Sequence, residues 1–191
     1  RILLHADWIA MVDAESTPRY LQEVKGSSFP VLLVAPHATA ALEPVGPFIE
    51  GWPNNKMEVA EEMNEWHDEG SGEAFEVACA KLSAQGFRPI LPRGLMDLNR
   101  GWKGREEAAE TLFGKGAISV WGLQHLRPGN CLEHLETWYR GAMDQLRQSS
   151  RNSRGFVEIH SYGDLGSTYD RQNGGRPLRR SEAAVVLSTP W

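Results

Sequence analysis

The chain has 191 residues, the length of one domain or slightly more. Apolar residues make up 41% and charged residues 24%, which is close to the globular average and excludes wholesale disorder and fibrous repeats. The formal net charge of −5 argues against a basic face that neutralises phosphates, so we expect no nucleic-acid partner. No stretch approaches the roughly 20 consecutive apolar residues of a membrane helix, and we expect no membrane association.

Four apolar runs have the length of β-strands: 31–35, 88–91, 156–159 and 183–187. Apolar residues recur with helical spacing over 57–66, 75–82 and 132–146, the last helix with Asn130 placed as its N-cap. Strands that alternate with helices need crossover connections. The sequence therefore predicts an α/β fold, with a mainly parallel (mixed) central sheet between helix layers in a three-layer α/β/α sandwich.

The two cysteines, Cys79 and Cys131, are too few for a disulfide framework. Both fall within predicted helices. We therefore expect buried thiols in a reducing compartment, and a cytoplasmic protein.

Two histidines follow predicted strands. His37 closes the run 31–36, and His160 closes the run 156–159. A side chain at the carboxyl end of a buried strand projects into the crevice where open sheets bind ligands. A single histidine there is often structural, with its hydrogen bonds satisfied, but two in equivalent positions favour a metal site.

A third metal ligand is available in Trp66-His67-Asp68-Glu69-Gly70, which we place at a helix start. The acidic residues of this segment are also explained as charges that complement the helix dipole. Two imidazoles and one carboxylate with an open fourth position would form the catalytic type of zinc site.

The most specific string is Asp-Leu-Asn-Arg at 97–100, with Arg93 four residues before its aspartate. It resembles the motif of the N-formylglutamate amidohydrolase family, and its Asn-Arg pair recurs in the related zinc carboxypeptidases. His160-Ser161-Tyr162 is similar to the histidine–serine element of both families, and 34–37 is similar to their first ligand strand. The resemblance covers about 30 to 165. Taken alone, the string 97–100 is also explained as a strand-end turn with a surface ion pair.

The resemblance implies a zinc-carboxypeptidase-like fold and a Zn²⁺ ion held by His37, Glu69 and His160. The family spacing points to Glu69 as the acidic ligand, with the adjacent Asp68 as the alternative. In that site the metal would activate a water molecule and polarise the scissile carbonyl.

The resemblance also assigns roles around the metal. Asn99 and Arg100 resemble the clamp for a substrate carboxylate. Arginine suits this role because its planar guanidinium binds both carboxylate oxygens at once. Arg93 would stabilise the oxyanion of the tetrahedral intermediate. Asp97 would orient Arg100 or a ligand histidine.

The general base is where the sequence departs most from the family, which takes a glutamate from a late strand. The sequence ends at Trp191, directly after a predicted strand. The base lies beyond these residues, or Glu158 or Glu182 replaces it, or the protein lacks one; Glu158 is our candidate catalytic residue. We thus expect residues 1–191 to form a single catalytic domain, which is truncated at its C-terminal end if the base lies beyond Trp191.

These expectations describe a zinc-dependent amidohydrolase that cleaves the N-acyl or N-formyl amide bond of an amino acid with a free carboxylate. Its partner would be a small N-acyl amino acid or a short peptide. One alternative is a zinc carboxypeptidase-like peptidase, which needs the same clamp and metal. Another is a non-catalytic domain that binds a metal or an amino acid and lacks the base.

Overall fold

The computed structural model describes residues 20–26, 28–102 and 116–161, and the backbone of 183–188. Its strands are β1 (Leu21–Val24), β2 (Leu32–Val34), β3 (Gly86–Pro89), β4 (Phe156–Ser161) and β5 (Ala183–Ser188). Its helices are η1 (Gly46–Phe48, a 3-10 helix), α2 (Lys56–Glu65), α3 (Ser71–Leu82), α5 (Val120–His125) and α6 (Cys131–Ser150). Among the described residues, no helix is long and apolar enough to cross a membrane.

The strands form one mixed sheet in the order β1-β3-β2-β4-β5. The three inner strands are parallel, because β2 pairs in parallel with both β3 and β4. Each outer strand pairs antiparallel with its neighbour, β1 with β3 and β5 with β4. The predicted α/β class is therefore confirmed, and the sheet is parallel in its centre and antiparallel at both edges.

Most predicted elements lie close to their expected positions, with two corrections. The strand expected at 88–91 is β3 at Gly86–Pro89, two residues earlier. It begins at Gly86, which pairs with Leu33 and Val24. Leu91 lies past the last paired residue, and its burial comes from core packing and not from strand pairing. Strand β1 was not predicted, because its two middle residues are exposed and polar and give no apolar run. Asn130 occupies the N-cap position of α6, as predicted, but its side chain caps no backbone N–H; its amide lies 2.9 Å from His134 Nε2.

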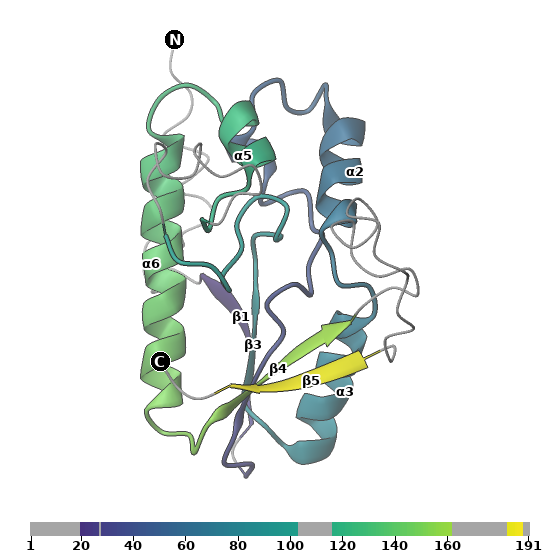
Figure 1. The fold of residues 1–191 in the computed structure, drawn as a ribbon, viewed down its shortest axis with the longest axis vertical. Coiled ribbons are helices and arrows are strands. Elements are labelled where there is room, and N and C mark those ends of the chain that lie inside the picture. The colour runs from purple at the N-terminus through teal and green to yellow at the C-terminus, as the bar shows by residue number, and fades with distance from the viewer. Residues whose placement is uncertain (1–19, 27, 103–115, 162–182, 189–191) are drawn as a thin grey trace, which may run out of the picture.

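Alternate residues of the inner strands enter two different apolar clusters. Leu32 and Val34 of β2 pack in the cluster that contains the buried face of α6, whereas Leu33 and Ala35 pack with Phe75 and Cys79 of α3. This division follows from the two-residue period of a strand, which sends successive side chains to opposite faces of the sheet. Figure 1 shows α6 along one side of the strands and α3 on the other.

The parallel order of β3, β2 and β4 brings their carboxyl ends to one edge of the sheet. A buried polar residue lies at or beyond this end of each strand: Asp97 after β3, His37 after β2, and His160 near the end of β4. Each of these three residues is only 5–7% exposed. The fold therefore gathers ionisable groups where an open α/β sheet binds its ligands.

Candidate metal centre

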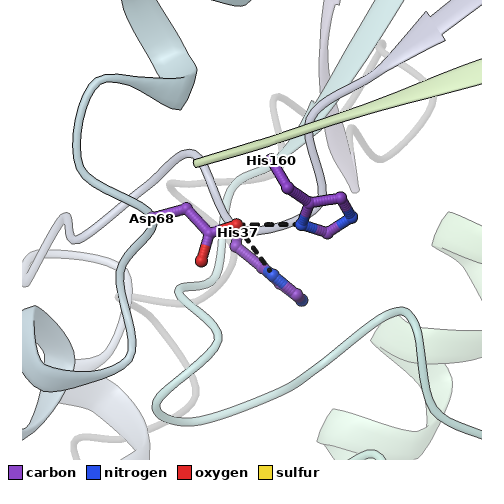
Figure 2. Close-up of side chains that lie close together, drawn as sticks. All are labelled: His37, Asp68 and His160. Atoms are coloured by element: carbon purple, nitrogen blue, oxygen red, sulfur yellow. Dashed lines mark hydrogen bonds and ion pairs between the residues drawn. The ribbon is translucent and has the colours of Figure 1, made fainter. Parts of the chain in front are cut away.

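Among the described residues, one group of three histidine, cysteine or acidic side chains could hold a metal ion: His37, Asp68 and His160. Their ligand atoms lie within 4.8 Å of one another. Oδ2 of Asp68 is 3.2 Å from Nδ1 of His37 and 2.8 Å from Nδ1 of His160. The two imidazole rings meet edge to face, with their centroids 4.8 Å apart. Figure 2 shows both rings turning Nδ1 toward the same carboxylate oxygen.

Asp68 is fixed by its backbone as well as by its side chain. It lies in the connection between α2 and α3, not at a helix start as expected, and its N–H donates to the carbonyl of His37 at 3.2 Å. Its carbonyl accepts from the N–H of Ser71 at 3.1 Å and from the Ser71 hydroxyl at 2.6 Å. These contacts join the segment after β2 to the first turn of α3, and they point the Asp68 carboxylate at the histidines.

Glu69, the acidic ligand preferred from the family spacing, does not join this group. Its side chain is exposed, whereas Asp68 is only 9% exposed and contacts both histidines. The hydroxyl of Ser161 donates to the backbone carbonyl of Glu69, which holds this residue by its main chain. The structure therefore favours the alternative, Asp68, and we correct the predicted ligand set to His37, Asp68 and His160.

Asp97 is the centre of a second, connected network. Its Oδ1 lies 3.1 Å from Nε2 of His37 and accepts from the Asn99 N–H at 2.9 Å. Its Oδ2 accepts from Nε of Arg93 and from Nε of Arg100, each at 3.1 Å. Asp97 is only 5% exposed, whereas the side chains of Arg93 and Arg100 are 24% and 35% exposed, so its ion pairs are half-buried and not fully at the surface. Asp97 thus contacts both Arg100 and a candidate ligand histidine, the two partners between which the resemblance left its role open.

The outer nitrogen of His160 also faces polar groups. Nε2 lies 3.5 Å from Oε2 of Glu158 and 3.5 Å from the side-chain amide of Asn99. Each histidine thus turns Nδ1 to Asp68 and Nε2 to a second carboxylate, Asp97 for His37 and Glu158 for His160. Paired carboxylates on the outer nitrogens are a common feature of histidines that bind metals.

The electrostatics of this group are strongly coupled. Burial raises the pKa of the Asp68 carboxyl, but hydrogen bonds from His160 and His37 outweigh burial and lower the pKa to about 2. At Asp97 burial is likewise outweighed, by the hydrogen bond from His37 and the charges of His37 and Arg93, and its pKa lies well below the usual range. Hydrogen bonds to Asp68 and Glu158 raise the pKa of His160 to about 9. The carboxylates thus favour positive charge between them.

The arginine expected to stabilise an oxyanion is held on three sides. Besides its bond to Asp97, Arg93 places Nη1 3.8 Å from Oδ1 of Asp68, and its guanidinium lies 5.7 Å from the ring centroid of Trp66. The indole N–H of Trp66 donates to Glu62 at 2.7 Å. The contact with Trp66 is of the cation–π type. The contacts of Trp66 and Glu62 near Arg93 were not predicted from the sequence. Their spacing of four residues is a signal that the two side chains could meet at the end of α2.

The donor set fits a small divalent cation. Around a tetrahedral ion with bonds of about 2.0–2.1 Å, ligand atoms lie roughly 3.3–3.4 Å apart. The separations of 3.2 and 2.8 Å from Asp68 Oδ2 to the two Nδ1 atoms are close to that value. All three ligand atoms lie within 4.8 Å of one another, so the three side chains could hold a metal ion.

The remaining predicted site residues lie around this group. Arg93 and Arg100 are partly exposed, with 24% and 35% of their side chains accessible, and Asn99 is exposed. The hydroxyl of Tyr139 on α6 donates to the carbonyl of Arg100 at 2.9 Å and fixes the end of the 97–100 turn. Glu182, the other candidate base in the chain, lies outside the described residues.

Comparisons of the chain with protein-family models, with curated proteins and with solved structures find no match. The resemblance to the amidohydrolases therefore stays a prediction. The interpretation of the site depends on its geometry.

Proposed function

We propose that this chain is a zinc-dependent hydrolase of the N-formylglutamate amidohydrolase type, which cleaves the N-acyl or N-formyl amide bond of an amino acid with a free carboxylate. The observation that carries the proposal is the convergence of His37 and His160, at the carboxyl ends of parallel strands, with Asp68 from the connection between α2 and α3. Two nitrogens and one carboxylate oxygen are one of the ligand compositions found in catalytic zinc sites.

The finer description of the fold belongs to the same proposal. Helices α3 and α6 pack against alternate strand residues, which supports a three-layer α/β/α arrangement of the zinc-carboxypeptidase kind. The partly exposed arginines beside the candidate ligands are consistent with such a site, because they offer positive charge where a small acidic substrate would lie.

A bound zinc ion would supply a water of lowered pKa and would polarise the scissile carbonyl. Residues of the chain would orient the substrate and stabilise the charges that develop on it. Asp97 holds the Nε atoms of Arg93 and Arg100 at 3.1 Å, so the two guanidinium groups are fixed relative to each other and to Asp68. In our proposal Arg93 stabilises negative charge that develops on the carbonyl oxygen, and Arg100 with Asn99 binds the substrate carboxylate.

The test compares matched N-acyl amino acids, one with a free α-carboxylate and one with that carboxylate amidated. The wild-type protein should prefer the free acid by about 100- to 1,000-fold in kcat/KM, because the amidated substrate cannot form the desolvated ion pair with Arg100. Arg100→Ala should lose most of this preference, mainly through KM, and Arg100→Lys should lose nearly as much because it cannot form the bidentate fork. Arg147→Ala, which removes an exposed arginine of α6, is the matched control.

Equal hydrolysis of both substrates would contradict the carboxylate clamp. Peptides with a free C-terminus that are cleaved faster than N-formyl amino acids would favour the carboxypeptidase-like alternative. Stoichiometric zinc without turnover on any of these substrates would favour a non-catalytic binding domain.

A further inference from the structure

Glu158 and His160 lie two residues apart on β4 and therefore project from the same face of the sheet. The backbone of Glu158 is paired on both sides, with Val34 of β2 and with Val186 of β5. Its side chain is only 16% exposed, and Oε2 lies 3.5 Å from Nε2 of His160. The carboxylate is thus held beside the imidazole at a position where β4 is paired with a neighbouring strand on each side.

The two candidate ligand histidines have the same pattern of contacts. His37 faces Asp68 with Nδ1 and Asp97 with Nε2, at 3.2 and 3.1 Å. His160 faces Asp68 with Nδ1 at 2.8 Å and Glu158 with Nε2 at 3.5 Å. In both rings the nitrogen turned to Asp68 is the one available to a metal, and the other nitrogen faces a second acidic group.

We propose that Glu158 is a positioning residue for His160, and that it is not the general base. Its carboxylate accepts the proton on Nε2, which fixes the tautomer that leaves the Nδ1 lone pair for the metal. The exposed amide of Asn99 also reaches Nε2, but a carboxylate offers acceptor atoms only and so selects the protonated form of that nitrogen. This inference rests on the metal centre of the proposed function.

The geometry also argues against a base at this position. A general base must reach the proton it removes within hydrogen-bond distance or through one water. The Glu158 carboxylate contacts the imidazole nitrogen remote from Asp68, whereas the proposed ligand atoms converge on the Nδ1 side. Glu158 therefore acts on the histidine and not on the water that the metal would bind.

Zinc titration of Glu158→Ala and Glu158→Gln against a chromophoric chelator tests the inference. Loss of an outer carboxylate partner should weaken zinc affinity by about 10- to 100-fold, and glutamine should restore part of it because its carbonyl oxygen still accepts a hydrogen bond. Glu61→Gln, which changes an exposed glutamate of α2, should bind zinc like the wild type. Thermal melts of the metal-free proteins check that each variant is folded.

The same variants separate a positioning residue from a base. A positioning role predicts that turnover per bound zinc falls less than about tenfold, and that the visible spectrum of the cobalt-substituted protein changes as His160 reorients. A general base predicts unchanged zinc affinity and a loss of turnover of about 100- to 10,000-fold at saturating zinc. Unchanged affinity in Glu158→Ala would overturn the inference, whatever the activity.

The titration also distinguishes this inference from the proposed function. A wild-type protein that binds zinc but hydrolyses no N-acyl amino acid would refute the proposed reaction, while the affinities of the variants would still decide the role of Glu158. A wild-type protein that binds no zinc would overturn both.

Discussion

Asp68 and Glu69 are neighbours with the same charge, and their surroundings give them different chemistry. The Asp68 carboxylate is 9% exposed and contacts two imidazoles, whereas the Glu69 side chain lies in solvent. A buried carboxylate is stable only when positive charge or hydrogen-bond donors surround it. At Asp68 those partners are the two histidines, which would turn their Nδ1 atoms to a metal ion when one is bound.

We predict that Asp68→Asn weakens zinc affinity by more than about 100-fold, because even an outer partner of a ligand contributes about 10- to 100-fold. Glu69→Gln should change the affinity less than about twofold. Competition titration of both variants against a chelator measures the difference. A larger loss in Glu69→Gln would return the acidic ligand to the position expected from the family spacing.

At the scale of elements, helix α3 approaches the sheet closely because Gly86 has no side chain. A Cβ atom at Gly86 would lie 2.5 Å from Sγ of Cys79 and 2.6 Å from Cε2 of Phe75. Both partners belong to the buried face of α3, and they are 2% and 0% exposed. The absence of a side chain at Gly86 therefore lets α3 pack directly against β3.

Gly86→Ala should therefore destabilise the protein by about 1–3 kcal/mol through overpacking. Cys79→Ala should compensate part of this loss, with a favourable coupling of about 0.5 kcal/mol or more in a double-mutant cycle. Urea unfolding of the two single variants and the double variant gives the three free energies. Gly155→Ala is the control, because its Cβ would meet nothing within 4 Å; equal losses at both glycines would contradict the packing argument.

At the scale of the whole molecule, the candidate metal centre joins three distant parts of the chain. His37 follows β2, Asp68 precedes α3, and His160 lies on β4, so a bound ion would link segments separated by 31 and 92 residues. An ion that binds only the folded state stabilises that state by mass action. Global stability should therefore depend on the free zinc concentration.

With free zinc at about 1,000 times its dissociation constant, the stabilisation should be about 4 kcal/mol. For a domain of this size, that corresponds to an increase in Tm on the order of 10 °C. Calorimetric scans with zinc and with a chelator measure the shift, and His160→Ala should show almost none of it. A shift of the same size in His160→Ala would mean that zinc stabilises the protein from another site.

Local patterns were sufficient to predict most of the elements and part of the site. Apolar runs and helical spacing predicted β2, β4, β5, α2, α3 and α6 close to their observed positions. The strand-end position of His37 and His160 predicted that these residues meet, because parallel strands share a carboxyl edge. The string at 97–100 marked Asp97 as a residue that orients its neighbours, and the structure confirms its contacts with His37 and Arg100.

Other features depended on tertiary contacts. The choice between Asp68 and Glu69 could not be made from spacing, because the segment between α2 and α3 is irregular and only its hydrogen bonds to His37 and Ser71 fix which carboxylate faces inward. Strand β1 was missed because its pairing with β3, and not an apolar run, defines it.

The environment of Glu158 shows the same limit. Its position on β4, two residues before His160, was visible in the sequence, but its contact with Nε2 was not. The sequence by itself determined the class of fold and which residue types meet at the carboxyl edge of the sheet. Only the tertiary structure decided which atoms of those residues face one another, because the orientation of an imidazole or a carboxylate is set by partners that are remote in the chain.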